Sequence, residues 1–283
     1  MSQIKEIKNR IKSIKDVQQI TKAMKMVAAA KLRKIEAKYE YAKMHLNEVE
    51  NILAFILKRN SWVKHDLLRD NDVSEKGLLV LSGDKGLCGG FNLNVVKKVL
   101  SEIAKTGKNK TKIFGVGKKA NISLKKESSE FLMDMRGIFG KVKYSDALSI
   151  SNEVMESFLS KKIGTVNIVL NRFKSKSEET VESVTLLPLE IPDSEASEAD
   201  FLYDCGVEAT VASLLPNYFS LKIYKYLLES ETAEFLARMT AMDAASENAN
   251  DLIAKLTLEY NRARQATITK EILDIVGGAE ALA

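Results

Sequence analysis

Apolar side chains recur at helical spacing through the first sixty residues, from Ile4 to Ile56. From Leu32 onward the apolar positions alternate between steps of three and four residues, which is the heptad repeat of a coiled coil. No glycine or proline interrupts the series, since the first glycine is Gly77. The pattern predicts one long helix, and residues 1–60 are expected to form the N-terminal half of a coiled coil.

The C-terminal part of the chain repeats this behaviour. Apolar or small side chains recur at helical spacing from Leu221 onward, without a glycine or proline to break them. Pro216 is a start signal for this helix and the pair Gly277-Gly278 a stop signal, so the predicted helix covers 217–276. At roughly 1.5 Å per residue, each terminal helix would be about 85–90 Å long. Two such helices can pair antiparallel.

The middle of the chain alternates short aliphatic runs with helical patterns, which is typical of an α/β domain. The predicted strands cover residues 77–81, 112–116, 131–135, 165–170 and 181–186, the last two as a hairpin. Helical patterns cover 92–105 and 144–160. The α/β domain is therefore expected over 77–190, and the acidic, proline-containing segment 191–216 is expected to be a connector.

Composition limits the chemistry that the chain can carry. It has two cysteines, Cys88 and Cys205, and two histidines, without the spacing of a zinc site or a catalytic triad. No apolar run approaches the roughly 20 residues that span a bilayer, and the N-terminus does not resemble a signal peptide. A protein of the cytoplasmic side, without metal or cofactor, is expected. Residues 1–34 hold ten Lys and Arg against Glu6 and Asp16, which suits a solvated face, an acidic protein partner or nucleic acid.

Two glycine-rich segments leave nucleotide binding open. Residues 82–92 (SGDKGLCGGFN) follow a predicted strand and open a helix, where glycines can approach a phosphate. The segment lacks the lysine-serine pair of a P-loop, so a tight turn is favoured. Residues 115–120 (GVGKKA) fit a dinucleotide fingerprint, with Asp134 as the acid that would bind ribose. The other interpretation is an ordinary turn between a strand and a helix.

Two further hypotheses find less support in the sequence. Cys88, near a helix start, is a candidate nucleophile, but no histidine is placed to activate it. The basic N-terminal helix is a candidate surface for nucleic acid, but no aromatic side chain precedes Tyr39 to stack on bases. No nucleic acid partner is expected.

Three segments together resemble the gamma subunits of F-type ATP synthases of the bacterial type. They are residues 20–31 (ITKAMKMVAAAK), residues 82–92, and the C-terminal stretches 237–245 (ARMTAMDAA) and 260–271 (YNRARQATITKE), in family order. The resemblance implies an α/β fold: a long antiparallel coiled coil of the N- and C-terminal helices plus a Rossmann-like α/β domain. It implies a non-catalytic rotor that transmits torque in the proton-translocating enzyme.

The resemblance also implies partners and contact residues. The partners would be three alpha and three beta subunits, the epsilon subunit and the membrane c-ring, with the chain peripheral to the cytoplasmic face of the membrane. The residues expected to face the mobile acidic loop of the beta subunit are Met24, Lys25, Arg238, Arg264 and Gln265, with Met24 near Arg238, Arg264 and Gln265. Those expected at the apolar bearing are Ile268, Ile272, Ile275 and Val276. Those expected at the foot near the c-ring and epsilon are Phe201, Leu202, Tyr203 and Asp204. The alternative is a coiled-coil scaffold whose α/β domain binds a nucleotide.

Overall fold

The computed structural model describes residues 2–127, 130–175, 178–192 and 205–280. Its contacts divide the chain into two units, each described here by itself. The helical unit comprises Met1–Ala29 and Arg238–Ala283, and the sheet unit comprises Ala30–Ala237. The two long helices, α1 (Ser2–Arg59) and α5 (Val207–Glu280), contribute to both units.

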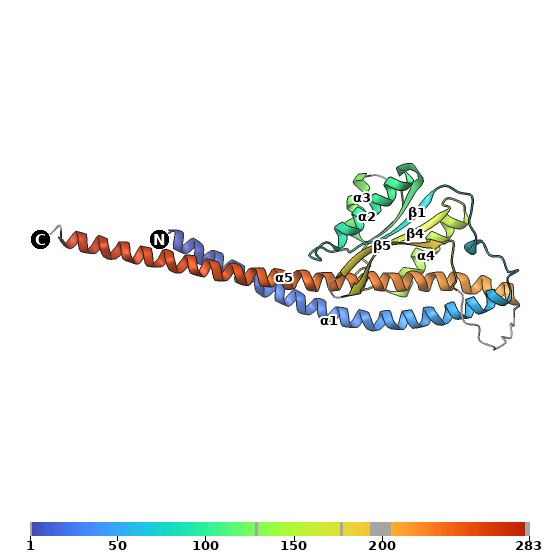
Figure 1. The fold of residues 1–283 in the computed structure, drawn as a ribbon, viewed down its shortest axis with the longest axis horizontal. Coiled ribbons are helices and arrows are strands. Elements are labelled where there is room, and N and C mark those ends of the chain that lie inside the picture. Colours follow the sequence, from blue (N-terminus) through green and yellow to red (C-terminus); the bar gives the residue numbers. More distant parts are fainter. Residues whose placement is uncertain (1, 128–129, 176–177, 193–204, 281–283) are drawn as a thin grey trace. The chain divides into compact units, whose positions relative to one another are not determined.

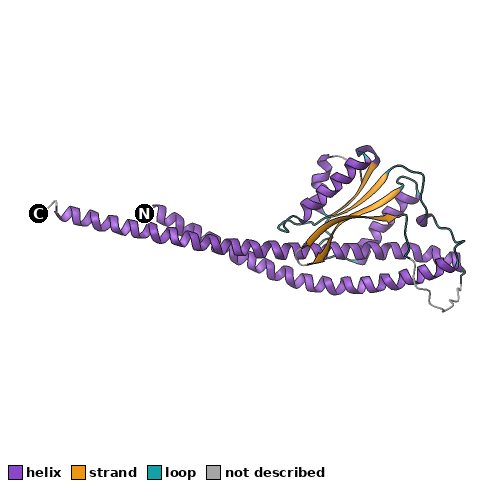
Figure 2. Cartoon of the chain, viewed as in Figure 1, coloured by secondary structure: helices purple, strands orange, loops and turns teal. Residues whose placement is uncertain are grey.

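The sheet unit is built on five strands in the order β3-β2-β1-β4-β5, drawn in orange in Figure 2. They are β1 (Lys76–Leu81), β2 (Thr111–Val116), β3 (Glu130–Met135), β4 (Thr165–Ser175) and β5 (Glu178–Leu187). The first four are parallel, and β5 runs antiparallel to β4. All five predicted strands, and the predicted hairpin, are confirmed.

Helices cover both faces of this sheet, as Figure 1 shows. On one face, α2 (Phe91–Thr106) and α3 (Lys118–Glu127) bury side chains such as Val95 and Leu124 against Leu78 and Val80 of β1. The other face is covered by α4 (Tyr144–Leu159), which is joined to α5 by the buried hydroxyl pair of Ser151 and Ser220 at 2.7 Å. Short 3₁₀ turns, η1 (Asp66–Leu68) and η2 (Lys108–Lys110), precede β1 and β2. The hydrophobic pattern predicts α2 and α4 but not α3, whose sequence is rich in lysine.

Within the sheet unit, α1 packs along α5 through the heptad positions that the sequence indicates. Leu32, Leu46 and Leu53 are all buried there. Near the end of this contact the Tyr218 hydroxyl donates to Glu50 Oε1 at 2.6 Å. Burial raises the pKa of Tyr218, and the Glu50 carboxylate raises it further because a tyrosinate beside it would be repelled.

The bounds of α5 correct two predictions. The helix begins at Val207, directly after Gly206 with its positive φ of 82°, and Pro216 lies inside it. The start signal at Pro216 is therefore wrong, because the preceding residues supply helical turns that tertiary packing holds. The stop signal at Gly277-Gly278 is also wrong, since α5 continues to Glu280. Of the predicted connector 191–216, residues 193–204 lie outside the described residues, and residues 207–216 are the first turns of α5 rather than connector.

Pro216 gives a direct test of this helix boundary. Pro216→Ala restores a backbone N–H that can donate to the carbonyl of Ala212, and it removes the ring's clash with the same turn. We expect the free energy of unfolding to rise by about 1–3 kcal/mol, measured by urea denaturation of the full chain. Ala209→Gly is the control that loosens the same turns. A less stable Pro216→Ala variant would mean that the ring's packing outweighs the missing hydrogen bond.

Candidate functional site

Polar side chains join the two helices of the helical unit at two places. Lys25 Nζ donates to Asp243 Oδ1 at 2.5 Å, and Gln18 Nε2 donates to Asn250 Oδ1 at 2.6 Å. The two pairs lie one heptad apart on both helices, with α5 antiparallel to α1. Each pair is partly exposed and contributes at most about 1 kcal/mol. Their main effect is to fix the register of the two helices.

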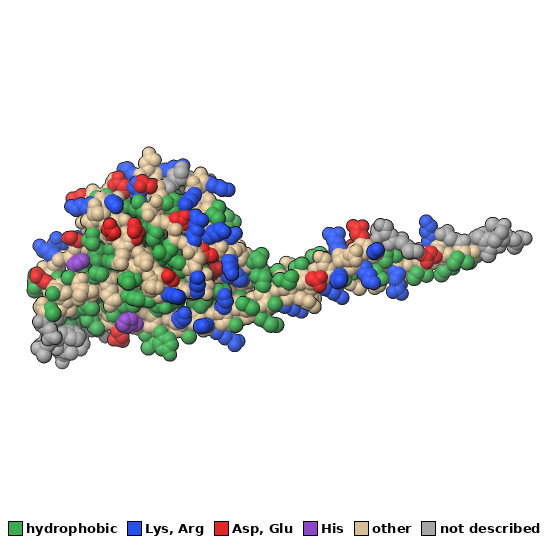
Figure 3. All heavy atoms as spheres, turned by 180° about the vertical axis from the view of Figure 1, so that it is seen from behind, with side chains coloured by type: hydrophobic (Ala, Val, Ile, Leu, Met, Phe, Trp, Pro, Cys, Tyr) green, Lys and Arg blue, Asp and Glu red, His purple; other side chains and the backbone are tan. Residues whose placement is uncertain are grey.

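The apolar stripe of α1 leaves the interface of the helical unit. Between Ile11 and Ile20 the apolar residues recur every three positions, and each such step falls about 60° short of a full turn. Val17, Ile20 and Val27 are consequently 50%, 59% and 57% exposed, while polar Thr21 is buried. Figure 3 shows apolar side chains between the lysines and arginines of the two-helix part. An exposed apolar surface rimmed by charge is typical of a protein interface.

The five residues assigned by resemblance to the beta subunit do not form one cluster. Met24 and Lys25 lie at the level of Asp243, and the buried Arg238 lies within about two turns of it on α5. The exposed Arg264 and Gln265 lie about 30 Å further along α5. The expectation that Met24 lies near Arg264 and Gln265 is therefore wrong within this chain, because the antiparallel register carries α5 away from Met24.

The residues assigned to the bearing form an exposed apolar stretch near the end of α5. Ile268, Ile272, Ile275 and Val276 are 43%, 54%, 71% and 54% exposed. Covering large aliphatic side chains that are this exposed with another apolar surface would be favourable, so the stretch has the character of an interaction surface. The residues assigned to the foot, 201–204, lie outside the described residues.

The glycine-rich segment 82–92 closes on itself. Gly83 N donates to Asn92 Oδ1 at 2.8 Å, and Asn92 Nδ2 donates to the carbonyl of Lys85 at 3.2 Å. Cys88 is buried in this turn, within 3.2 Å of the same Asn92 amide. The Gly83 amide, a backbone donor that a phosphate could use, is thus engaged by a side chain of the segment itself.

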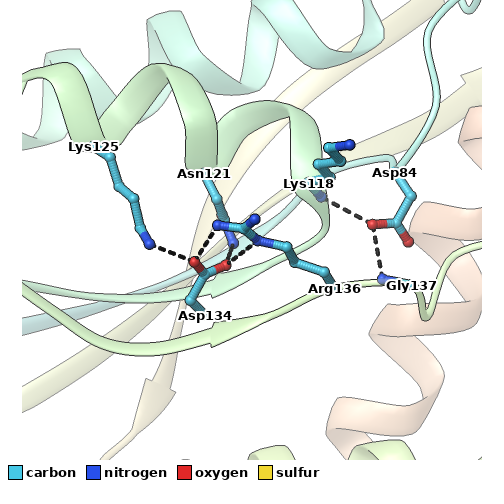
Figure 4. Close-up of polar contacts among 7 residues, drawn as sticks. All are labelled: Asp84, Lys118, Asn121, Lys125, Asp134, Arg136 and Gly137. Atoms are coloured by element: carbon cyan, nitrogen blue, oxygen red, sulfur yellow. Dashed lines mark hydrogen bonds and ion pairs between the residues drawn. The ribbon is translucent and has the colours of Figure 1, made fainter.

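The carboxylate of Asp84 lies at the start of α3, the position that the dinucleotide fingerprint assigns to a pyrophosphate. Asp84 Oδ1 accepts hydrogen bonds from Lys118 N at 3.0 Å and Gly137 N at 2.9 Å, as Figure 4 shows. Asp84 Oδ2 accepts one from Phe139 N at 3.0 Å. An internal anion therefore satisfies the positive end of the helix, and a phosphate at this point would meet a negative charge.

Gly117 brings two loops of the protein together rather than admitting a ligand. Its φ is +94°, and a Cβ at this position would lie 1.8 Å from the carbonyl oxygen of Ser82. The neighbouring Ser82 hydroxyl donates to the carbonyl of Val116 and accepts from Ala120 N. The second glycine of the fingerprint thus serves the contact between the ends of β1 and β2.

Asp134, the candidate ribose ligand, is bound to neighbouring side chains. Arg136 grips its carboxylate with two hydrogen bonds of 2.9 and 2.6 Å, and Lys125 and Asn121 approach at 2.5 and 2.8 Å (Figure 4). The Arg136 guanidinium, followed by Lys125 and Asn121, holds the pKa of Asp134 far below its usual range. Both oxygens of the Asp134 carboxylate are thus bound to side chains of this chain at the edge of the sheet, where a ribose would have to compete with them.

Helix α5 covers the place where an open α/β sheet usually binds its ligand. That place is the carboxyl end of the strands where the strand order reverses, here between β1 and β4. Cys88 and Phe91 pack against Ala233 of α5 at this end, and a Cβ on Gly83 would come within 3.0 Å of Glu234 Oε1. The usual ligand crevice is therefore filled by protein.

Two acidic residues with structural roles are not singled out by sequence reasoning. Asp84 belongs to the glycine-rich segment but resembles an ordinary turn residue. Glu231 is only 2% exposed, and its Oε1 accepts from Gly140 N at 2.7 Å. The available signal for Glu231 is a carboxylate at a helical position whose neighbours along the same face, such as Leu227 and Phe235, are buried and apolar.

The described residues also bear on a metal site and on a membrane-spanning helix. Within the described ranges, no three His, Cys, Asp or Glu side chains gather in a way that could hold a metal ion. Among the same residues, no helix combines the length and apolar character needed to cross a membrane.

Comparison with known proteins assigns the family. A model of the ATP synthase family matches residues 3–282. The ATP synthase gamma chain of Halothermothrix orenii is 41% identical over 288 residues, covering both chains in full. That of Brevibacillus brevis is 39% identical over 283 residues, covering 99% of each chain. The chain belongs to the gamma-chain family of ATP synthases.

Solved structures share the fold of this gamma-family chain. A chain of the Euglena gracilis mitochondrial ATP synthase superposes with a TM-score of 0.68 at 18% identity, covering 99% of this chain and 95% of that one. A chain of the central stalk and c-ring structure from Tetrahymena thermophila gives 0.58 at 24% identity, covering 80% of this chain and 99% of that one. The predicted fold class, long paired terminal helices with an α/β domain, is confirmed.

Gly117 and Gly107 form a matched pair for testing this site. Both have φ near +95°, but a Cβ at Gly107 would meet nothing within 4 Å. Gly107→Ala should therefore cost only backbone strain, of order 1–3 kcal/mol. Gly117→Ala should cost clearly more, because the Cβ overlaps the Ser82 carbonyl. Urea denaturation of both full-length variants measures the difference; equal losses would show that the contact between Ser82 and Gly117 can relax freely.

Proposed function

We propose that this chain is the rotor, or central-stalk, subunit of a bacterial proton-translocating F-type ATP synthase. Its similarity to bacterial gamma chains over the whole length carries this proposal. In this role the chain transmits torque between a membrane c-ring and a hexamer of alpha and beta subunits, and so couples proton flow to ATP synthesis or hydrolysis. It is a non-catalytic subunit, peripheral to the cytoplasmic face of the membrane.

The helical unit is suited to a surrounding hexamer. Its exposed Val17, Ile20 and Val27 offer apolar contact area along the shaft. The exposed aliphatic stretch from Ile268 to Val276 suits a bearing that lets the shaft turn, because apolar contacts are not directional. A shaft that makes different contacts with each beta conformation can bias those conformations as it turns. The epsilon subunit and c-ring would bind at the foot that includes residues 201–204.

No observation favours a scaffold with a nucleotide-binding domain. The Asp84 carboxylate occupies the start of α3, and α5 fills the crevice at the end of β1. The proposed function therefore needs no cofactor in this chain, since nucleotides would bind the alpha and beta subunits. It also needs no nucleic acid partner.

Purification of the tagged chain from its own cells tests the proposal. Alpha, beta and epsilon subunits should co-purify, and vesicles that contain the complex should pump protons on addition of ATP. The isolated chain should neither hydrolyse ATP nor bind Mg-ATP or NAD⁺ in titration calorimetry. Micromolar binding of either nucleotide to the isolated chain, without alpha and beta subunits among its companions, would overturn the proposal in favour of the scaffold.

A charge swap separates the two roles open to Lys25. Lys25→Glu and Asp243→Lys should each cost about 0.2–1 kcal/mol of stability by breaking the pair, and the double variant should restore stability. If Lys25 also faces an acidic loop of the beta subunit, the double variant should still pump fewer protons per ATP hydrolysed, because its residue 25 is negative. Lys43→Glu, an exposed reversal on the sheet-unit part of α1, is the control. Full recovery of pumping in the double variant would limit Lys25 to fixing the register.

A further inference from the structure

One short backbone segment of the sheet unit, residues 137–142, is held by carboxylates from two distant parts of the chain. The segment joins β3 to α4. Asp84, from the turn after β1, accepts from Gly137 N and Phe139 N at 2.9 and 3.0 Å. Glu231, from α5, accepts from Gly140 N at 2.7 Å. Three amides within four residues are thus bound to side chains rather than to a neighbouring strand.

Burying the Glu231 carboxylate carries a desolvation penalty that an apolar side chain at the same position would avoid. Burial raises the pKa of its carboxyl, while hydrogen bonds from the backbone of Gly140 and Val142 act in the opposite direction. The charged and titratable groups that face it are Glu234 and Tyr224 of α5 and Lys38 of α1. A leucine would fill the same space without a desolvation penalty. The carboxylate instead provides directional hydrogen bonds, which hold the amides of Gly140 and Val142 at a fixed position relative to α5.

A rotor needs such a directional contact between its shaft and its sheet. Interdigitated apolar packing resists separation and sliding of whole elements, but it fixes no particular backbone amide, whereas a hydrogen bond to a carboxylate does. The segment 137–142 follows β3, an edge strand that only β2 holds within the sheet. Through this segment the edge is tied to the central strand β1 by Asp84 and to α5 by Glu231. All these residues belong to one compact unit, Ala30–Ala237.

We propose that Glu231 is a positioning residue of the rotor, which locks the segment 137–142 to α5 so that the sheet and the shaft helix turn as one body. This inference rests on the proposed function. Its prediction is that loss of the Glu231 bonds reduces coupling without removing the ability of the complex to hydrolyse ATP.

Three full-length variants test the inference: Glu231→Leu, which removes both acceptor oxygens, Glu231→Gln, which keeps one, and Glu153→Gln, an exposed control on α4. Hydrogen–deuterium exchange of the isolated chains reports on residues 137–142. Exchange should be roughly 10- to 100-fold faster in Glu231→Leu, since a hydrogen bond to a charged group is lost, and intermediate in Glu231→Gln. In vesicles with the assembled complex, protons pumped per ATP hydrolysed should fall in the same order and stay normal in Glu153→Gln.

Two outcomes would overturn the inference. Unchanged exchange in Glu231→Leu would show that the carboxylate does not hold the segment. Faster exchange with normal pumping per ATP would show a purely structural role. If Glu231→Leu does not assemble, Glu231→Gln decides by the same two measurements. Failure of the unaltered chain to assemble with alpha and beta subunits would instead contradict the proposed function, so the two failures are distinguishable.

Discussion

The pairing of α1 with α5 is the constraint on which the rest of the structure depends. A helix of 58 or 74 residues is stable only where it buries one face. In the sheet unit, α1 buries that face on α5, and α5 in turn packs against α4 and the loops at the end of the sheet. Helix α5 therefore fills the crevice at the carboxyl end of β1, where it meets Cys88, Phe91 and Gly83. The same packing that stabilises the helices removes the place where a ligand would bind.

The sequence indicates most of this architecture because long periodic segments and short aliphatic runs are its clearest signals. All five strands and the helices α2 and α4 follow from the pattern, whereas α3 does not, since four of its ten residues are lysine and few are apolar. Helix ends are harder to predict. Pro216 and Gly277-Gly278 are strong local signals, yet α5 passes through both. At Pro216 the buried neighbours Val211 and Leu215 hold the helix against an unfavourable residue.

The candidate site shows where local patterns stop being informative. The sequence identifies the glycines of residues 115–120, but it cannot show that the close neighbour of Gly117 is the Ser82 carbonyl rather than a phosphate. Likewise, Ile14 and Val17 occupy equivalent positions in the hydrophobic pattern, although Val17 is 50% exposed and Ile14 is partly buried. Resemblance supplies five contact residues but not the register that separates Met24 from Arg264. Each missing fact concerns a partner that lies far away in the sequence.

The internal carboxylates explain how a fold with ligand-binding geometry can do without a ligand. The first N–H groups of α3 and those of the loop after β3 need acceptors, since unpaired buried amides are costly. In a nucleotide-binding protein of this topology a phosphate supplies them. Here Asp84 and Glu231 supply them permanently. These amides of the sheet unit are thus paired without a bound phosphate. Under the proposed function such internal pairing suits a rotor, because its stiffness should stay the same while nucleotides are bound, converted and released by its partners.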